Sequence, residues 1–296
     1  MKPDPRFINQ PKYFWANVRT ISQHVGYTER AKRQPRTKMK KRISGRIKVP
    51  TIDEMIQSLV DLNLRPQHLV DGSGRPTSLG SALHAYFNHR AVVLNSFVEP
   101  RLMNVTKARK VFGQLKRDLR PSCPIPMNKQ KGSKRAAAYF TAIVNMLIEA
   151  NASGLSCDYD PRELTTITRD GAPIRTLARR VDGAFPSAVN PIAVWEIKEY
   201  YYTTTFGSRV ADGVYESLLD GMELEELREH EGIDVKHYLM VDDHFTWWDC
   251  GRSYLCRIID MLHMGYVDEV LFGSEVVERM PSIVKEWVKI ARKRNS

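Results

Sequence analysis

Two short apolar segments in the second half of the chain constrain its fold more than any other feature. The first runs from Leu177 to Phe185 and the second from Ala193 to Lys198, and the turn signal Asn190-Pro191 stands between them. β-Branched and apolar runs of this length, bounded by turn residues, are typical of strands. The sequence therefore predicts two neighbouring strands that enter the core of a globular domain.

Charged residues interrupt both segments at positions that strand geometry brings together. Side chains alternate along a strand, so Glu196 and Lys198 share one face while Trp195 and Ile197 share the other. If the two strands pair in antiparallel order, Asp182 lies beside Glu196 and Lys198. Because unpaired buried charge is costly, two carboxylates and an amine at the end of an apolar sheet indicate a functional site.

These groups are suited to binding a metal ion next to a phosphate. Two carboxylates, together with the carbonyl of the residue between Glu196 and Lys198, are oxygen ligands of the kind that Mg²⁺ prefers. A neighbouring lysine can orient or deprotonate a water molecule, and the metal can stabilise charge on a phosphate. We therefore expect Asp182, Glu196 and the carbonyl of Ile197 to bind Mg²⁺.

Asp182, followed by Glu196-Ile197-Lys198, resembles the catalytic motif of the PD-(D/E)XK nuclease superfamily, most closely its type II restriction endonucleases. Val181 precedes Asp182, where the motif's name has proline. The resemblance implies a restriction-endonuclease-like core and a Mg²⁺-dependent endonuclease of restriction-modification systems. It also implies that Lys198 positions and activates the water for in-line attack on DNA, which leaves a 5′-phosphate and a 3′-hydroxyl.

The same resemblance implies double-stranded DNA as the substrate, a homodimer or tetramer that cuts both strands, and a bacterial or archaeal cytoplasm. No G-x(4)-G-K-[ST] loop is present, so no nucleotide cofactor is expected. No apolar run approaches the roughly 18 residues that span a bilayer, and Met1–Pro5 lacks the apolar core of a secretory signal. The alternatives are a structure-specific repair or junction nuclease, a non-enzymatic DNA-binding protein and an RNA-binding protein.

The formal net charge of +11 divides unevenly along the chain. Residues 1–150 hold 28 Lys and Arg against 9 Asp and Glu, a net charge of +19, whereas residues 151–296 hold 17 against 25, a net charge of −8. A half that binds a polyanion and a half that binds a metal would produce this division, and a basic solubility tail is the alternative. We expect a basic, mainly helical DNA-binding region over residues 1–130 and the nuclease core over residues 131–296.

Two basic loops are expected to contact the DNA backbone. Arg30–Lys48 contains ten basic residues and no acidic one, and its candidate phosphate contacts are Lys38, Lys40, Lys41 and Arg42. The second loop runs over Lys129–Arg135, and its candidate contacts are Lys131, Lys134 and Arg135. Solvated charge without a ligand is the alternative for both loops.

A third candidate contact follows the strand expected near residues 237–245. Trp248, Asp249 and Arg252 stand where that strand is expected to lead into a helix. The guanidinium of Arg252 has the geometry to donate two hydrogen bonds to a guanine. Packing of Trp247 and Trp248 in the core is the alternative.

The remaining pattern predicts an α/β (α+β) fold, with a mixed central sheet flanked by helices. A hairpin turns on Asp170-Gly171 and carries Asp182 in its second arm, and strands follow near 193–198, 237–245 and 267–272. Helices are expected within 7–24 and over 52–62, 77–95, 105–119, 134–150, 208–229, 252–264 and 275–294. Glu216 is a candidate catalytic acid and Glu149 a second, with a solvated carboxylate as the alternative for each.

Overall fold

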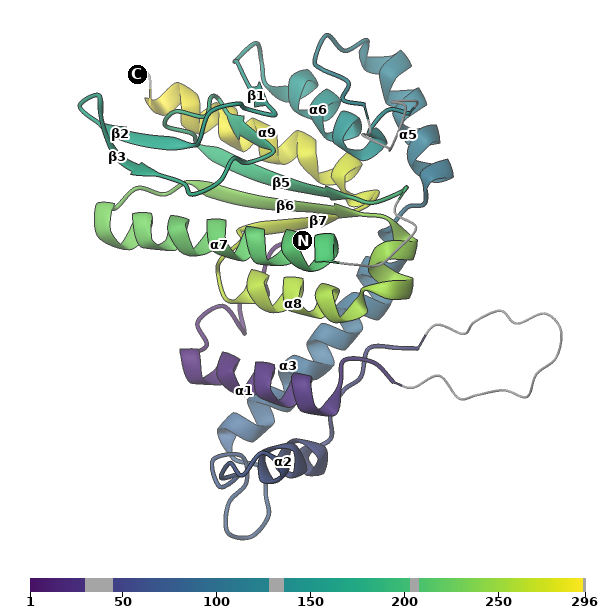
Figure 1. The fold of residues 1–296 in the computed structure, drawn as a ribbon, viewed down its shortest axis with the longest axis vertical. Coiled ribbons are helices and arrows are strands. Elements are labelled where there is room, and N and C mark those ends of the chain that lie inside the picture. The colour runs from purple at the N-terminus through teal and green to yellow at the C-terminus, as the bar shows by residue number, and fades with distance from the viewer. Residues whose placement is uncertain (30–44, 128–135, 203–207, 295–296) are drawn as a thin grey trace, which may run out of the picture.

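The protein has an α+β fold in which helices cover both faces of a mixed sheet (Figure 1). The computed structural model describes residues 1–29, 45–127, 136–202 and 208–294. Within these ranges, five strands form the main sheet in the order β1-β4-β5-β6-β7. The mixed sheet with flanking helices that the sequence pattern predicts is thus confirmed.

The main sheet is antiparallel on one side and parallel on the other. β1, β4 and β5 pair in antiparallel order, whereas β5, β6 and β7 run parallel to one another. The strands are Asp158–Tyr159 (β1), Gly183–Phe185 (β4), Ala193–Glu199 (β5), Lys236–Asp242 (β6) and Glu269–Phe272 (β7). β5 and β6 lie inside the sheet with both faces covered, which explains their nearly continuous apolar runs.

Two layers of helices cover the sheet. α6 and α9 pack on one face, where Trp195 of β5 stacks on Trp287 of α9, and α7 and α8 pack on the other. α5 packs against α6. The bounds are Val105–Leu119 (α5), Tyr139–Asn151 (α6), Ser208–Glu231 (α7), Arg252–His263 (α8) and Glu275–Arg294 (α9), with a short helical segment, η2, over Phe245–Cys250. None of the described helices is long and apolar enough to cross a bilayer.

The N-terminal helices build a separate apolar cluster next to α8 (Figure 1). They are α1 (Lys12–Val25), α2 (Ile52–Asp61) and α3 (Ser78–Val92), which continues through η1 (Val93–Val98) into α4 (Glu99–Arg101). A capping box begins α2, because the Thr51 hydroxyl accepts from the Glu54 N–H and the Glu54 carboxylate accepts from the Thr51 N–H. Thr77 caps α3 by accepting from the Gly80 N–H.

A buried ion pair connects these N-terminal helices to the core. The guanidinium of Arg90 on α3, 1% exposed, donates to both carboxylate oxygens of Asp260 on α8 at 3.0 Å. The Tyr86 hydroxyl donates to the same carboxylate at 2.6 Å, and Arg90 also donates to Ser22 of α1 at 3.0 Å. The charge of each partner is therefore compensated inside the protein.

The hairpin differs from its expected place in the sheet. β2 (Thr166–Arg169) and β3 (Ala172–Thr176) do pair across the Asp170-Gly171 turn, whose residues both have positive φ. They form a two-stranded sheet of their own, and β3 ends before Asp182. The prediction that the second arm carries Asp182 is therefore wrong: a non-strand segment leads from β3 to β4.

Two other expectations about the elements need correction. α6 begins at Tyr139 and not near residue 134, because the chain before it forms a bridge between Met127 and Ala137. β1 was not anticipated, since a strand of two residues has no recognisable alternation. Its pairing with β4 nevertheless gives the antiparallel side of the sheet a third strand.

A methyl group at Gly183 is expected to destabilise the strand pair next to the charged cluster. A Cβ there would lie 2.1 Å from the ring of Trp195, which is itself packed on Trp287. Overpacking of this kind typically costs about 1–3 kcal/mol, so Gly183→Ala should lower the free energy of unfolding by that amount in urea denaturation.

Gly113→Ala in α5 is the matched control for that change. A Cβ at Gly113 meets nothing closer than Arg117 at 3.6 Å. Because alanine is the better helix former, this variant should be more stable by about 0.5–1 kcal/mol. Equal stability of the two variants would contradict the close packing at Gly183.

Candidate active site

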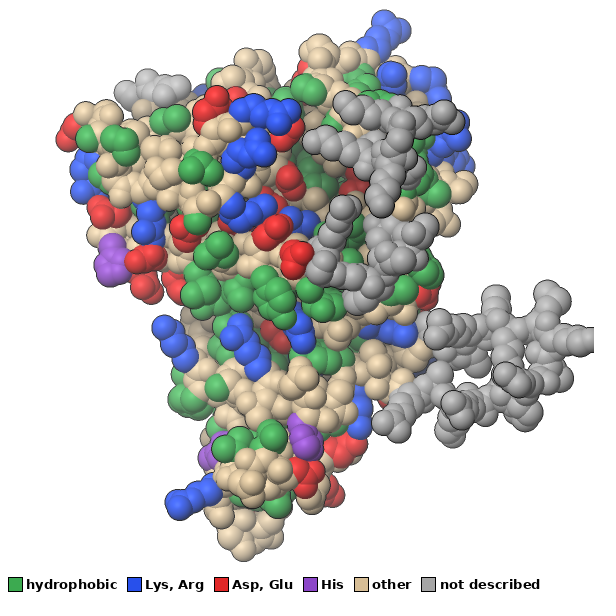
Figure 2. All heavy atoms as spheres, viewed as in Figure 1, with side chains coloured by type: hydrophobic (Ala, Val, Ile, Leu, Met, Phe, Trp, Pro, Cys, Tyr) green, Lys and Arg blue, Asp and Glu red, His purple; other side chains and the backbone are tan. Residues whose placement is uncertain are grey.

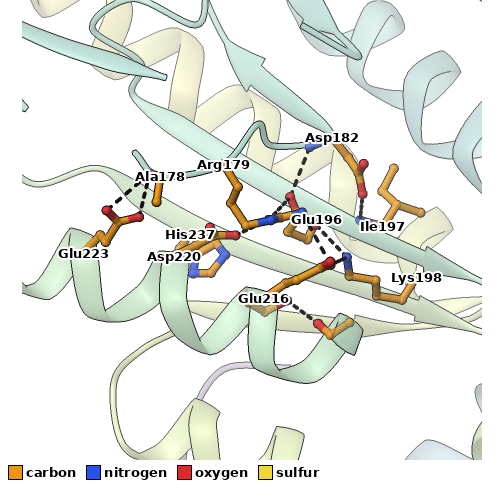
Figure 3. A network of polar contacts seen from close by, with 12 residues as sticks. Ala178, Arg179, Asp182, Glu196, Ile197, Lys198, Glu216, Asp220, Glu223 and His237 are labelled. Atoms are coloured by element: carbon orange, nitrogen blue, oxygen red, sulfur yellow. Dashed lines mark hydrogen bonds and ion pairs between the residues drawn. The ribbon is translucent and has the colours of Figure 1, made fainter. Parts of the chain in front are cut away.

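Asp182, Glu196 and Lys198 meet at the end of the β4–β5 pair, as the sequence predicts (Figure 3). The Lys198 ammonium donates to Glu196 Oε2 at 2.7 Å, which confirms that their side chains share one face of β5. The Asp182 N–H donates to Glu196 Oε1 at 3.2 Å, and the Ile197 N–H donates to Asp182 Oδ2 at 2.7 Å. Lys198 and Glu196 are therefore bonded side chain to side chain, and Asp182 is tied to them through backbone N–H groups.

The antiparallel register explains this convergence. Gly183 pairs with Trp195, so Asp182 stands one residue beyond the end of β4, opposite Glu196. The Trp195 carbonyl accepts from the Asp182 N–H at 3.1 Å. Because the backbone groups of residues two apart in a strand point to the same side, the Ile197 carbonyl is directed toward the Asp182 side of β5.

The cluster is shielded by α7. Glu196 is 0% exposed and Lys198 is 8% exposed. Helix α7 crosses Lys198 so closely that a Cβ at Gly213 would lie 3.1 Å from its side chain. The absence of a side chain at position 213 thus lets the helix cover the lysine stem.

Glu216 is brought to the same cluster. Its carboxylate accepts from the Lys198 ammonium at 2.9 Å, and it remains 42% exposed at the surface of α7. Glu149 lies elsewhere, because its carboxylate accepts from the N–H and the hydroxyl of Ser122. Of the two additional acids considered from the sequence, the structure brings only Glu216 to Lys198.

Two further residues complete the network, and the sequence reasoning missed both. Arg179 forms a fork on Glu196, with N–O distances of 2.9 and 3.1 Å, and donates to Asp220 Oδ2 at 2.6 Å (Figure 3). Asp220 is fully buried, and its Oδ1 has no hydrogen-bond partner among the described residues. A signal for Asp220 was available, since it follows Glu216 by one helical turn on α7.

The charged groups of the cluster change one another's pKa. Burial and the neighbouring Glu196 carboxylate raise the pKa of Asp182 from 3.8 to about 6. Burial also acts to raise the pKa of Glu196, but Lys198 and Arg179 outweigh it, and that pKa is lowered. For Lys198, the attraction of Glu196 and Asp182 exceeds the opposite effect of burial, so its pKa is raised.

The oxygen atoms that could hold a hard divalent cation belong to Asp182, Glu196 and Ile197. No group of three or more His, Cys, Asp and Glu side chains in the described part of the chain is arranged to hold a metal. The set consists instead of two carboxylates and the Ile197 carbonyl, all oxygen, with water available for the remaining positions. A bound cation would offset the burial and the repulsion by Glu196 that raise the pKa of Asp182.

The residues proposed to contact DNA lie in different surroundings. Trp248 is 1% exposed, so its ring belongs to the core and is no longer a candidate for stacking or contact with DNA. Trp247 is buried as well and donates to the Lys198 carbonyl at 3.4 Å. Asp249 is exposed and lies 3.6 Å from His244, and Arg252 donates to the Gly45 carbonyl at 2.6 Å. The candidates Lys38, Lys40, Lys41, Arg42, Lys131, Lys134 and Arg135 lie outside the described residues.

Another buried acid lies at the end of β6, outside the acid–lysine cluster. Asp242 is fully buried and accepts hydrogen bonds from the Met103 N–H at 2.7 Å, from the Asp243 N–H at 2.9 Å and from the Tyr201 hydroxyl. Burial nevertheless raises the pKa of Asp242 from 3.8 to about 8. The folded chain therefore binds this proton more tightly than the unfolded chain does.

We expect this carboxyl to make the protein less stable as pH rises. Between about pH 4 and pH 8 the unfolded chain releases a proton that folded Asp242 retains, so the free energy of unfolding falls by up to about 1.4 kcal/mol per pH unit. Asp242→Asn removes this titration and should flatten the profile measured by urea unfolding, whereas Asp118→Asn at an exposed site of α5 should leave it unchanged. Parallel profiles for wild type and Asp242→Asn would contradict the assignment.

The fold and the cluster together define a mixed α+β protein with an acid–lysine site at the end of a strand pair. The chain belongs to the family described as domain of unknown function DUF7687, whose model matches residues 103–287, more than half of the sequence. A second domain of unknown function, DUF7690, matches residues 1–97. No curated protein matches the chain, and no solved structure does either. The first match contains the whole sheet and the acid–lysine cluster, and the second contains the N-terminal helices α1 to α3.

Proposed function

We propose that the protein is a Mg²⁺-dependent DNA endonuclease of the PD-(D/E)XK superfamily, of the type II restriction kind. The observation that carries this proposal is the convergence of Asp182, Glu196 and Lys198, with an Ile197 carbonyl directed to the same edge. Chain order supports it further, because Asp182 and the Glu196-Ile197-Lys198 tripeptide stand on adjacent antiparallel segments, as the motif requires.

The topology is consistent with a restriction-endonuclease-like core. Helix α6 precedes three antiparallel strands, β1, β4 and β5, and α7 then crosses over to the parallel strand β6. The acid–lysine cluster stands where β4 begins and the antiparallel β5 continues beyond it. Open α/β sheets commonly hold their reacting groups at strand ends.

Each residue of the cluster has a role in the proposed reaction. Asp182, Glu196 and the Ile197 carbonyl would hold the cation. Mg²⁺ bound there supplies charge stabilisation for the phosphate under attack. Arg179 holds both oxygens of Glu196 in one orientation through its fork, so a cation would bind Glu196 in exchange for part of that fork.

Lys198 would act as a donor and not as a base. Its ammonium lies between the carboxylates of Glu196 and Glu216, which favour the charged form. A charged lysine orients a water molecule by hydrogen bonding and stabilises negative charge on the phosphate, but it cannot accept a proton. Glu216, the partly exposed carboxylate of the cluster, would receive the proton of that water.

Double-stranded DNA is the proposed substrate because of the charge distribution. The net charge of +19 over residues 1–150 suits a polyanion, while the half that carries the cluster is acidic. Two active sites are needed to cut both strands of a symmetric site, so we propose a homodimer or a higher assembly.

The proposal is tested by digesting a sequenced plasmid with Mg²⁺ and with EDTA in place of Mg²⁺, followed by mapping of the ends. Discrete fragments with 5′-phosphate ends, formed only with Mg²⁺, are the expected result. Cleavage confined to branched or mismatched DNA would assign the same site to a repair or junction nuclease. Cleavage that persists in EDTA, or none on any DNA, would contradict the proposal.

A further inference from the structure

A second site lies on the other side of α7 from the acid–lysine cluster. A cavity of about 450 Å³ opens between α1, α7 and α8. Its walls include Arg19 of α1, Tyr27 just after α1, Tyr215 of α7 and Arg257 of α8. This volume falls within the range of small-molecule sites, and the position bridges the two regions matched by separate family models.

Arg257 is held in the wall of this cavity without an acidic partner. It donates to the hydroxyl of Tyr215 at 2.8 Å and to that of Tyr27 at 3.5 Å, and its guanidinium lies 5.0 Å from the ring centroid of Tyr254. No carboxylate of the described residues forms an ion pair with it. The nearby acid Asp260 is already neutralised by Arg90. A half-buried arginine fixed in this way presents positive charge to whatever enters the cavity.

Arg19 adds a second cation at the mouth of the cavity. It is exposed, donates to the sulfur of Met264 at 3.4 Å and forms no ion pair with a described carboxylate. Figure 2 shows hydrophobic side chains gathered over α7 and α8, with Lys and Arg side chains bordering them toward α1. The cavity therefore combines two guanidinium groups at an apolar surface.

Apart from Thr20, Gln23 and Asp260, the rest of the lining is aromatic and aliphatic. Val214, Leu218 and Met261 form the apolar part, and the Tyr215 ring is 51% exposed beside them. Inorganic phosphate would bind the arginines but would make no contact with the apolar surface. An uncharged apolar molecule would contact that surface but would not bind the arginines. A planar aromatic group that carries an anion uses both.

From this combination we infer that the cavity binds a nucleotide, with the phosphate on Arg257 and the base against Tyr215 and the apolar wall. Base stacking on an aromatic side chain contributes about 1–3 kcal/mol in single-stranded nucleic acid complexes. The nucleotide is either free or one unit of a single strand, since both present the same base and phosphate. The inference does not rest on the proposed nuclease activity, because none of the cavity residues belongs to the acid–lysine cluster.

Isothermal titration calorimetry in EDTA tests it with two probes, deoxyadenosine 5′-monophosphate and a single-stranded oligo(dA), and with inorganic phosphate as the comparison. Wild type is expected to bind at least one of them, and binding by Arg257→Gln should be about tenfold weaker, as loss of a hydrogen bond to a charged group predicts. Tyr215→Ala, at a half-exposed position, should weaken binding similarly and carries the test if Arg257→Gln does not fold. Binding of the mononucleotide identifies a free ligand, and binding of the oligonucleotide alone identifies a strand.

Arg101→Gln is the matched control. Arg101 also lies over an aromatic ring, 3.6 Å from the centroid of Phe97, and forms no ion pair with a described carboxylate, but it does not line the cavity. This variant should bind both probes as wild type does. Three results would overturn the inference: equal affinity of wild type and Arg257→Gln, inorganic phosphate binding as tightly as the mononucleotide, or no binding of either probe.

Discussion

Lys198→Met is expected to lower the rate of DNA cleavage by about two to three orders of magnitude while leaving DNA binding intact. The ammonium is the shared donor of the cluster, 2.7 Å from Glu196 and 2.9 Å from Glu216. Its removal takes away the group that orients water and stabilises charge, but no proposed DNA-anchoring residue. Single-turnover cleavage with Mg²⁺ measures the first effect, and a mobility-shift titration in EDTA measures the second.

Lys236→Met separates this effect from the loss of any ion-paired lysine on the sheet. Lys236 begins β6 and pairs with Asp234 and Asp268, away from Asp182 and Glu196. Cleavage by this control should match wild type, and thermal unfolding should establish that both variants fold. If the protein binds DNA without cutting it, Lys198→Met and wild type should behave alike. Cleavage by Lys198→Met at the wild-type rate would refute the role of the lysine.

Arg90→Ala is expected to cost about 3–5 kcal/mol of stability, the largest effect on folding that we anticipate. The substitution leaves the buried Asp260 carboxylate without its ionic partner, and it removes the donor to Ser22. The arginine also lies 5.0 Å from the ring centroid of Phe87, so packing is lost with the charge. Urea unfolding monitored by circular dichroism gives the change in the free energy of unfolding.

Arg6→Ala provides the comparison for that result. Arg6 pairs with Asp4 at 2.7 Å, but its side chain is 67% exposed, and exposed pairs are usually worth less than about 1 kcal/mol. A loss in Arg90→Ala as small as that in Arg6→Ala would show that the buried pair does not hold α3 against α8. Two separate unfolding transitions in Arg90→Ala would indicate instead that the N-terminal helices uncouple from the core.

Local patterns predicted the centre of the site because the geometry there depends on alternation within one strand. Glu196 and Lys198 are two residues apart, so any strand through them puts both on one face. Asp182 required one further assumption, antiparallel pairing, and a short connection between two apolar segments favours it. The helix that carries Glu216 was predictable from its apolar spacing, although its direction over the sheet was not.

Residues that depend on non-local geometry were missed or misplaced. Arg179 lies in the non-strand segment between β3 and β4, and only the path of that segment over α7 brings it to Glu196 and Asp220. Trp248 was expected near DNA because it follows a strand, but η2 turns it into the core. Composition cannot distinguish these outcomes, since a tryptophan suits both a stacking surface and a packed interior.

Divalent-cation binding tests the central claim, that Asp182 and Glu196 form a metal site, without knowledge of the DNA sequence that is cut. Mn²⁺ takes the same oxygen ligands as Mg²⁺ and is followed in solution by electron paramagnetic resonance. Wild type should bind Mn²⁺, and Asp182→Asn and Glu196→Gln should each bind it at least about tenfold more weakly, because each loses a carboxylate ligand. Equal Mn²⁺ binding by the three proteins, or none by wild type, would contradict the account.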